Sequence, residues 1–348
     1  MTDASAASSV ERALERRREL VNDAIPEEIP VAEPERLYEA SRYLLDAGGK
    51  RLRPTILLLV AEALADVPPL SESYRSFPTV DGGEVDVMAA AVSVEIVQSF
   101  TLIHDDIMDD DDLRRGVPAV HEHYDVETGI LAGDTLYAKA FESMLDTEAG
   151  PERSVRATER LATTCTEICE GQSLDIAFEN RADAVTPEEY LEMIELKTAV
   201  LYAAAASIPA ILVGAEAAVD PLYRYGLDVG RAFQIQDDLL DLTTPSERLG
   251  KQRGSDLVEG KQTLITLHAR QQGVDVDSLI DAGSTAAVTE SDIDDAVAEL
   301  EAAGSIQYAR ETAQDLVDSG KGHLDVLPDN EARRTLEGIA DYLVEREY

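Results

Sequence analysis

The sequence predicts an all-α protein, a bundle of long helices, and three features indicate this class. Apolar residues recur with helical spacing in segment after segment, proline and glycine mark the segment ends, and no convincing alternating run predicts a strand. The expected helices are longer than average, which suits a bundle with a deep interior. With 348 residues, 44% of them hydrophobic, the chain can bury a large core. Since no sharp linker divides it, we expect a single domain over residues 1–348.

The first half of the chain is expected to hold six helices. Residues 1–30 form an N-terminal helical extension, Gly48-Gly49 ends the second helix, and Pro54 opens the third. Residues 66–87 are rich in proline, glycine and serine, so we expect a loop insertion there. The expected helices are Glu11–Asn22, Pro34–Ala47, one from Pro54, Met88–Asp112, one beginning near Asp134, and Glu152–Phe178, which contains GQSLD with Gly171, Gln172 and Asp175.

The second half continues with helices at Pro187–Val213 and Pro221–Thr243, a polar loop at 246–261, and helices to the end. The most apolar run, Ala199–Ala215, has 17 residues and includes Pro209. It is shorter than the ~20 apolar residues of a spanning helix, so we expect a kinked, buried helix and no membrane span. Cys165 and Cys169 have no further ligands and are expected as core residues. The first thirty residues are charged throughout and do not form a signal peptide, so we expect a cytoplasmic protein.

Acidic residues dominate the composition. The formal net charge is −40, which argues against nucleic acid or anionic lipid as partners. Only six lysines occur, against 24 arginines. This balance resembles that of proteins from halophiles that accumulate KCl, whose acidic surfaces stay hydrated in concentrated salt. We therefore expect each retained lysine to have a specific function.

An aspartate run, HDDIMDDDDLRRG at residues 104–116, is the strongest chemical signal. Asp105 and Asp109 stand four apart, so on a helix both carboxylates face the same way and can bind one cation. Mg²⁺ fits, because it takes few carboxylates and keeps positions for phosphate oxygens, which the following arginines can also bind. A second copy, QDDLLD, has the same spacing at residues 236–241. The alternative is a solvated acidic helix face, but the basic flanks of both copies favour binding.

Together these motifs resemble a family, the trans-isoprenyl diphosphate synthases, and within it the archaeal type of geranylgeranyl diphosphate synthase. The similarity covers about residues 35–265, from GGKRLRP through both aspartate motifs to Lys261. The two-residue spacer between the aspartate pair and Asp109 is typical of the archaeal type. The resemblance implies the isoprenoid synthase fold, mostly antiparallel helices around a central substrate cavity, with the motifs facing each other across its mouth. We also expect a homodimer.

The resemblance implies a role for each matching residue. Metal ligands for Mg²⁺, several ions per active site, would be Asp105, Asp106, Asp109, Asp237, Asp238 and Asp241. Isopentenyl diphosphate would be bound by Lys50, Arg53, Gln98 and Arg115. The allylic diphosphate would be bound by Arg114, Lys197, Thr198, Gln234, Lys251 and Lys261. Catalysis would depend most on Asp105, Asp109, Arg114, Lys197 and Asp237.

The chemistry explains these residue types. Diphosphate leaves an allylic carbon only if its growing charge is neutralised, which metal ions, lysine and arginine do in place. The allylic cation then needs an apolar tunnel that excludes water. In the family, bulk five residues before the first aspartate forms the tunnel floor, so Phe100 with the small Thr101 predicts geranylgeranyl diphosphate. Phe100 could instead be an ordinary core residue.

Two positions depart from the family pattern, Asp110 where asparagine is usual and Ala119 where threonine is usual, and neither belongs to the expected ligand set. Farnesyl or geranylfarnesyl diphosphate synthase is the alternative function. A terpene cyclase would normally lack GGKRLRP and the arginine pair, and a non-catalytic subunit usually has eroded aspartates. The remotest alternative is a non-catalytic acidic helical binding protein, which would not need Lys50, Lys197, Lys251 and Lys261.

Overall fold

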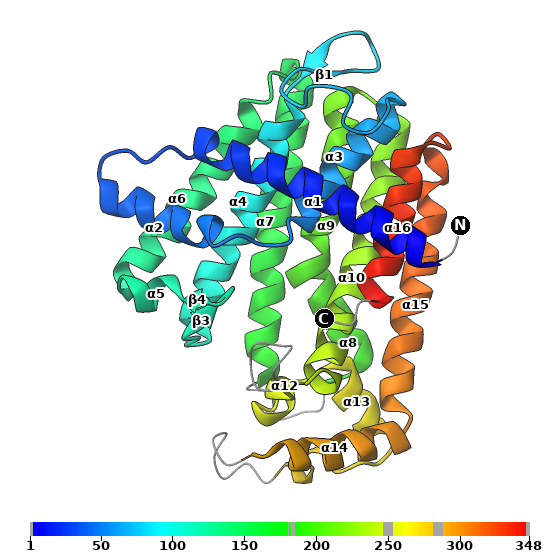
Figure 1. Ribbon diagram of the computed structural model, residues 1–348. Coiled ribbons are helices and arrows are strands. Elements are labelled where there is room, and N and C mark those ends of the chain that lie inside the picture. The colour runs from blue at the N-terminus through cyan, green and yellow to red at the C-terminus, as the bar shows by residue number, and fades with distance from the viewer. Residues whose placement is uncertain (1–2, 180, 182–184, 246–252, 281–287, 346–348) are drawn as a thin grey trace. The chain divides into compact units, whose positions relative to one another are not determined.

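A computed structural model of the protein describes residues 3–179, 181, 185–245, 253–280 and 288–345. Most of this part of the chain is helical, which confirms the all-α class (Figure 1). The strands within it form two short antiparallel hairpins, β1 (Phe77–Pro78) with β2 (Glu84–Val85) and β3 (Leu113–Arg114) with β4 (Val117–Pro118).

The helices follow the predicted order. Up to residue 179 they are α1 (Asp3–Glu28), α2 (Glu35–Asp46), α3 (Leu52–Ala65), α4 (Val87–Met108), α5 (Val120–His123), α6 (Val126–Leu145) and α7 (Pro151–Glu179). Then come α8 (Pro187–Ile194), the π-helix η1 (Glu195–Ala199), α9 (Val200–Val213), the 3₁₀ turn η2 (Glu216–Ala218) and α10 (Val219–Thr243). The last are α12 (Ser255–Val258), α13 (Leu264–Gln271), η3 (Val276–Ser278), α14 (Glu290–Ala302), α15 (Ser305–His323), η5 (Leu324–Val326) and α16 (Glu331–Glu345).

Internal contacts group the chain into two compact units, which we describe separately. The first unit comprises Met1–Cys165, Leu201–Tyr223 and Leu324–Ile339. The second unit comprises Thr166–Val200, Arg224–His323 and Ala340–Tyr348. The single-domain organisation stays a prediction.

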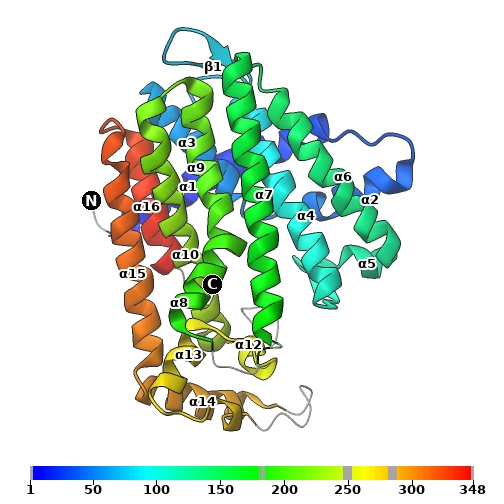
Figure 2. The same ribbon diagram turned by 180° about the vertical axis from the view of Figure 1, so that it is seen from behind.

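The core of the first unit is built on α3 and α4, whose side chains are buried nearly throughout. Asp86 begins α4 by accepting the N–H of Ala89 at 2.8 Å. Helix α6 lies alongside α4 (Figures 1 and 2). Its Gly133 gives room to the His104 ring, since a Cβ there would lie 2.2 Å from His104 Nε2. A glycine notch thus fixes the end of α4 that carries the aspartates.

Three predicted helices have wrong boundaries. The first runs over Asp3–Glu28 instead of Glu11–Asn22. Helix α4 ends at Met108 instead of Asp112, with Asp109 as C-cap and Asp110 left-handed at φ 57°. Helix α6 begins at Val126 instead of Asp134, because Asp125 caps it by accepting the N–H of Thr128 at 2.7 Å. Asp109 and Asp110, predicted to continue α4, therefore end it, and Asp125 starts α6 earlier than predicted.

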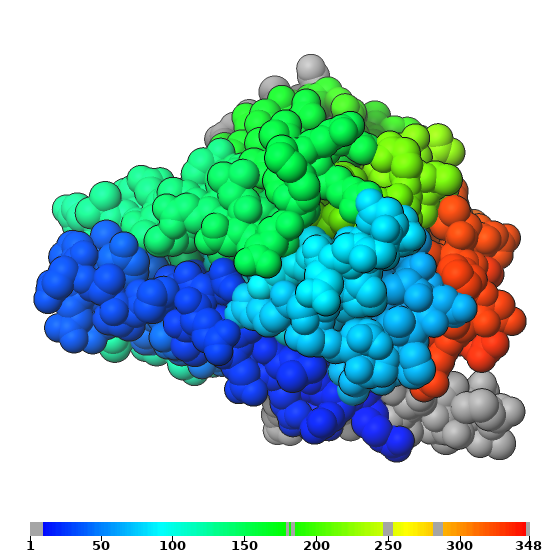
Figure 3. Space-filling model, turned by 90° about the horizontal axis from the view of Figure 1, so that it is seen from above, coloured from blue at the N-terminus to red at the C-terminus, as the bar shows by residue number. Residues whose placement is uncertain are grey.

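The 66–87 segment is anchored against α1 by buried charge. Arg17 of α1 pairs with Glu62 of α3 at 2.5 Å, and both side chains are 1% exposed. Glu62 also accepts the hydroxyl of Tyr74 and, at 2.9 Å, the N–H of Leu70. Figure 3 shows the segment, in cyan and light blue, lying beside the dark blue α1. The predicted extension and the predicted loop insertion therefore pack on each other.

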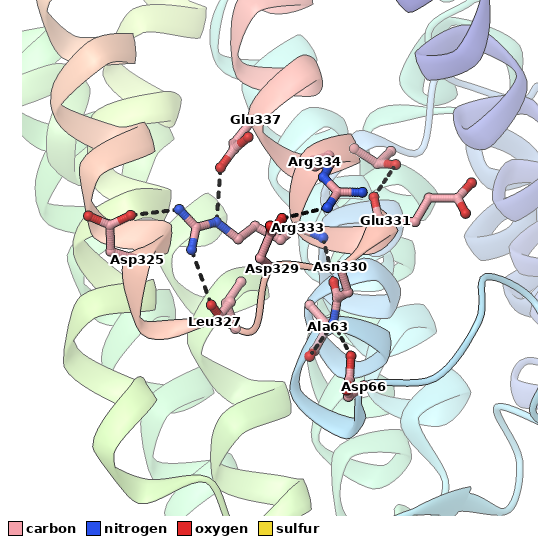
Figure 4. Close-up of polar contacts among 11 residues, drawn as sticks. Ala63, Asp66, Asp325, Leu327, Asp329, Asn330, Glu331, Arg333, Arg334 and Glu337 are labelled. Carbon is pink, nitrogen blue, oxygen red and sulfur yellow. Dashed lines mark hydrogen bonds and ion pairs between the residues drawn. The ribbon is translucent and has the colours of Figure 1, made fainter.

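The start of α16 closes over the end of α3 in the same unit (Figure 4). The Asn330 amide donates to the carbonyl of Ala63 at 2.9 Å and to Asp66 at 3.0 Å. Beside it, the Arg333 guanidinium bonds Asp325 at 2.6 Å, Glu337 at 2.9 Å and the carbonyl of Leu327 at 3.2 Å. Each nitrogen of that guanidinium therefore has an acceptor.

Within the described residues, two helical runs are long and apolar enough to cross a membrane, Val87–Met108 and Pro187–Val213. The most apolar window of each is 78% and 83% buried in the protein, as in core helices. The apolar run with Pro209 is therefore a buried helix, α9, as predicted.

In the second unit, α14 runs across the end of α15 (Figure 2). Helix α15 is fastened to α10 by Ser319, which donates to Asp228 at 2.8 Å. Gly320 follows it, and a Cβ there would lie only 3.4 Å from the side chains of Asp228 and Val229, so the two helices pack closely. This unit carries the second aspartate motif.

Candidate active site

The first aspartate motif lies on the last turn of α4 in the first unit. Asp105 is half-buried, Asp106 is fully buried, and Asp109 is exposed as the C-cap, its N–H bonding the carbonyl of Asp105 at 2.8 Å. Asp105 and Asp109 thus lie on one helical turn, as the spacing predicts. The exposed face of the motif is the one that a diffusing ligand can reach.

Asp106 is paired with Arg114. The Arg114 Nε donates to Asp106 Oδ1 at 2.6 Å, and Nη2 donates to Asp111 at 2.8 Å. Burial raises the pKa of Asp106, and the charge of Arg114 opposes that shift. The other carboxylate oxygen, Oδ2, is buried without a hydrogen-bond partner. A buried carboxylate oxygen without a hydrogen-bond partner is a favourable position for a cation or an ordered water.

Arg115 is placed by a tight hairpin. Strands β3 and β4 are joined by Arg115-Gly116 with φ of 54° and 78°, as a two-residue type I′ turn requires. The turn directs the Arg115 guanidinium back to the GGKRLRP segment, where it bonds the carbonyl of Gly48, and it also bonds the carbonyl of Leu44 on α2 at 3.1 Å. A Cβ on Gly49 would lie 3.0 Å from Arg115 Cζ, and the φ of 147° at this residue favours glycine as well.

The remaining isopentenyl-side residues also belong to the first unit. Lys50 is exposed and Gln98 is half-buried on α4. The Arg53 guanidinium lies over the ring of Tyr202, 4.1 Å from its centroid, a cation–π contact that fixes the side chain. Between them, Arg51 is buried and pairs with Glu95 of α4. Sequence reasoning missed Glu95, although an acid between Val87 and Gln98 in so apolar a helix was a usable signal.

The second motif lies on α10 in the second unit. Asp237 is half-buried, whereas Asp238 and Asp241 are buried. Asp238 accepts the hydroxyl of Tyr190 and, at 3.0 Å, the amide of Gln234, which in turn accepts from Thr198 at 3.0 Å. Tyr190 is a further residue that the sequence did not single out.

Asp238 of the second motif is buried close to other carboxylates, which favours the binding of a cation. Burial raises the pKa of Asp238 well above its usual range, and the charges of Asp256 and Asp237 add to the shift. Burial likewise raises the pKa of Tyr190. The tyrosine therefore stays a neutral donor to the carboxylate, and a cation would be needed for the carboxylates to ionise together.

Asp241 anchors the chain that follows the polar loop. Its carboxylate accepts the hydroxyl of Ser255 at 2.8 Å and the N–H of Asp256 at 3.1 Å, at the start of α12. Its carbonyl accepts the N–H of Gly254 at 2.8 Å. Lys261 is exposed, 3.0 Å from Glu259. Lys251 lies outside the described residues.

Lys197 and Thr198 lie on the π-helix η1, where one extra residue widens the helical turn. A Cβ on Gly171 of α7 would lie 2.2 Å from the backbone nitrogen of Lys197. One turn further along α7, Asp175 accepts the Lys197 ammonium at 2.5 Å. GQSLD therefore provides both a notch and a partner for Lys197.

Gly171→Ala should displace this π turn. Overpacking of this kind costs about 1–3 kcal/mol of unfolding free energy, and we expect kcat to fall about tenfold or more as Lys197 moves. Gly322→Ala is the matched control, a helical glycine of the same unit whose Cβ would meet nothing within 4 Å. Melting curves and kcat of both variants check this. Equal Tm and kcat values for the two variants would contradict the proposal that Gly171 makes room for the π turn at Lys197.

The carboxylate groups of the two motifs could hold metal ions. Among the described residues, no three His, Cys, Asp or Glu side chains converge closely enough to hold an ion. The donor chemistry nevertheless fits Mg²⁺: Asp106 has an unused buried oxygen, and each hydrogen-bonded oxygen of Asp238 keeps a second lone pair. The six-aspartate ligand set stays a prediction.

Phe100 is 6% exposed and meets Tyr137 of α6 edge-on, with ring centroids 5.2 Å apart. Thr101 is half-buried, and its hydroxyl bonds the carbonyl of Gln98 at 2.9 Å. The contact with Tyr137 is one that a core residue would also make. The role of Phe100 in product length stays a prediction.

Comparisons with known proteins give a consistent result. Residues 34–300 match the family model for polyprenyl synthetase. The chain is 70% identical to the geranylfarnesyl diphosphate synthase of Natronomonas pharaonis over 99% of this chain and 100% of that one. It is 50% identical to the geranylgeranyl diphosphate synthase of Methanosarcina mazei, covering 96% and 97% of the two chains.

The fold agrees with this relationship. The solved geranylgeranyl pyrophosphate synthetase of the archaeon Geoglobus acetivorans superposes with a TM-score of 0.84 at 43% identity, covering 96% of this chain and 99% of that one. The match spans both aspartate motifs and the GGKRLRP segment. On sequence and fold together, the chain belongs to the polyprenyl synthetase family and is a trans-prenyltransferase.

Proposed function

We propose that the protein condenses isopentenyl diphosphate with dimethylallyl, geranyl and farnesyl diphosphates, depends on Mg²⁺, and makes geranylgeranyl diphosphate as its main product. One observation carries the assignment of the isopentenyl site. The β3–β4 hairpin joins the carboxylate motif to the GGKRLRP turn, with Arg114 on Asp106 and Arg115 on Gly48. Carboxylates for metal and guanidiniums for phosphate thus come from neighbouring residues, as two diphosphates held side by side would need.

The reaction needs three bond changes. The allylic C–O bond breaks, and diphosphate leaves with the electron pair. The double bond of isopentenyl diphosphate then attacks the allylic cation and forms the new C–C bond. Loss of a proton from the resulting cation, to the departing diphosphate, restores a double bond. No histidine base is required.

The chain's own groups have distinct tasks. When bound by the aspartates, Mg²⁺ would supply Lewis acidity toward the diphosphate oxygens. By the resemblance to the family, Lys197, held by Asp175, and Arg114, held by Asp106, would each give fixed positive charge to the allylic diphosphate as it leaves. Arg115, Arg53 and Lys50 would orient isopentenyl diphosphate. Thr198 and Gln234 would contact the allylic partner through the same network that reaches Asp238.

Geranylfarnesyl diphosphate is the second candidate product, because the 70% identical relative carries that name. The test is to incubate the purified protein in molar KCl with Mg²⁺, labelled isopentenyl diphosphate and each allylic starter, and to size the dephosphorylated products. A twenty-carbon product supports the first candidate, and a twenty-five-carbon product supports the second. No condensation with any starter would contradict the proposed function.

Two further parts of the proposal concern the protein's state. We propose a homodimer in the cytoplasm, without a membrane-spanning segment and without nucleic acid as a partner. The net charge of −40 supports the absence of a nucleic-acid partner, because it repels the phosphate backbone of nucleic acids.

Phe100→Ser tests the tunnel floor. If Phe100 closes the tunnel, the smaller side chain should lengthen the main product by one or more five-carbon units with turnover preserved. A core residue would instead lower the unfolding free energy by about 3–5 kcal/mol on truncation to Ala, with unchanged product length. Chromatography of dephosphorylated products beside melting curves distinguishes the two roles. Phe141→Ser is the control, since Phe141 contacts Tyr137 from the same helix α6 and not from α4.

A further inference from the structure

Glu95 is a buried acid in an apolar helix. It is 3% exposed on α4, where its neighbours along the chain are Val94 and Ile96, both 0% exposed. A carboxylate is costly to bury unless it is paired. Its Oε1 accepts from Arg51 Nη1 and, at 3.3 Å, from Arg115 Nη2. One carboxylate oxygen therefore serves two guanidiniums.

Both arginines are held in a left-handed backbone. Arg51 has φ 50° and Arg115 has φ 54°, a conformation that ordinary side chains rarely adopt and that the surroundings must enforce. Arg51 is fixed further by Asn22 Oδ1 at 2.9 Å and by the carbonyl of Leu45 at 2.6 Å. Glu95 is the group that both strained residues share.

The local charge is unbalanced. Burial lowers the pKa of Arg115, the charge of Glu95 opposes that shift, and the charge of Arg51 adds to it. Two guanidiniums against one carboxylate leave the cluster positive beside Gly48 and Gly49. Because Arg51 is fully enclosed, an anion bound there would meet the Arg115 guanidinium, which is a preorganised donor as long as it keeps its direction.

We propose that Glu95 is a positioning residue, which sets the Arg115 guanidinium in the direction that the diphosphate of isopentenyl diphosphate requires. This inference rests on the proposed function, because it takes isopentenyl diphosphate as the ligand of Arg115. The buried Arg51 holds Glu95 in place, and Glu95 acts on the substrate through Arg115. Its loss should therefore affect one substrate and spare the other.

Glu62 provides a matched control in the same unit. It is also a buried glutamate paired with an arginine, and it accepts from Arg17, Tyr74 and Leu70. Its partners are Arg17 of α1 and Tyr74 and Leu70 of the 66–87 segment, and none of them is an expected substrate-binding residue. A purely structural glutamate should behave like Glu62, with lower stability and unchanged substrate KM values.

The experiment compares Glu95→Gln, Glu95→Asp, Glu62→Gln and Lys50→Ala in the full chain in molar KCl. For each variant, KM is measured for isopentenyl diphosphate and for the allylic starter, with kcat and a melting curve. Glu95→Asp keeps the carboxylate, but its side chain is one methylene shorter. It can therefore test the inference even if Glu95→Gln does not fold. We expect both Glu95 variants to raise KM for isopentenyl diphosphate about tenfold, with the allylic KM within about twofold.

Lys50→Ala provides the pattern of a lost direct contact, and Glu62→Gln provides the pattern of lost stability alone. Glu95 variants that follow Glu62→Gln, with a lower Tm and both KM values unchanged, would overturn the inference. Equal rises in both KM values would overturn it as well. If the unaltered protein itself forms no product from isopentenyl diphosphate, the proposed function fails, and that result is separate from either variant's behaviour.

Discussion

Asp105→Ala is expected to lower kcat by about 10²-fold or more while the protein stays folded. Asp105 is half-buried on the last turn of α4 and shares that turn with Asp109. If both hold Mg²⁺, removing one carboxylate weakens the neutralisation of the departing diphosphate, which matters most in the transition state. Turnover with saturating substrates, beside a melting curve, measures the effect.

Asp110→Asn is the matched control for this variant. Asp110 is exposed and lies outside the expected ligand set, and its left-handed φ of 57° suits asparagine. We expect its kcat to stay within about twofold of the unaltered protein. EDTA should stop the reaction of both, and excess Mg²⁺ should restore it. Activity of Asp105→Ala that matches Asp110→Asn, or turnover that survives EDTA, would exclude the proposed metal mechanism.

Transfer from molar KCl to about 0.01 M salt is expected to lower Tm by roughly 20 °C, or to unfold the protein outright. The chain carries a net charge of −40 on 348 residues, and repulsion between these charges opposes the compact state. The screening length grows from about 3 Å at 1 M to about 30 Å at 0.01 M, so distant carboxylates then repel one another. Melting curves across a KCl series measure the change.

Sucrose at matched water activity separates screening from general exclusion of cosolvent. Excluded osmolytes favour burial without screening charge, so sucrose should recover only part of the lost Tm. NaCl should recover most of it, because screening depends on ionic strength. A Tm that does not change between 0.01 M and 1 M KCl would contradict this account.

Local chemistry explains what the sequence could predict. Aspartates four apart, a glycine pair before a basic segment, and proline at helix starts act within one turn of chain, so the motifs and most helices follow from residue order. The end of α4 could not be predicted in this way. The helix ends where Asp110 adopts a left-handed backbone, and a run of aspartates does not indicate which of them will adopt it.

The residues that support the site depend on packing between segments. Glu95 matters because Arg51 and Arg115, 44 and 20 residues away in sequence, both turn toward it. Tyr190 reaches Asp238 across 48 residues. The π turn at Lys197 exists where Gly171 of another helix leaves room for it. The residue pattern within one segment cannot predict contacts between side chains that are so far apart in the sequence.

The contact of Asn330 with the end of α3 has a consequence for biosynthesis. Its partners Ala63 and Asp66 precede it by 267 and 264 residues. At about 5–20 residues per second, a ribosome needs roughly 13 to 50 s to add that length of chain. During that time the end of α3 lacks this partner, so the first unit can be completed only after Asn330 has been synthesised. Until then, the apolar helices of this unit must be kept from wrong associations.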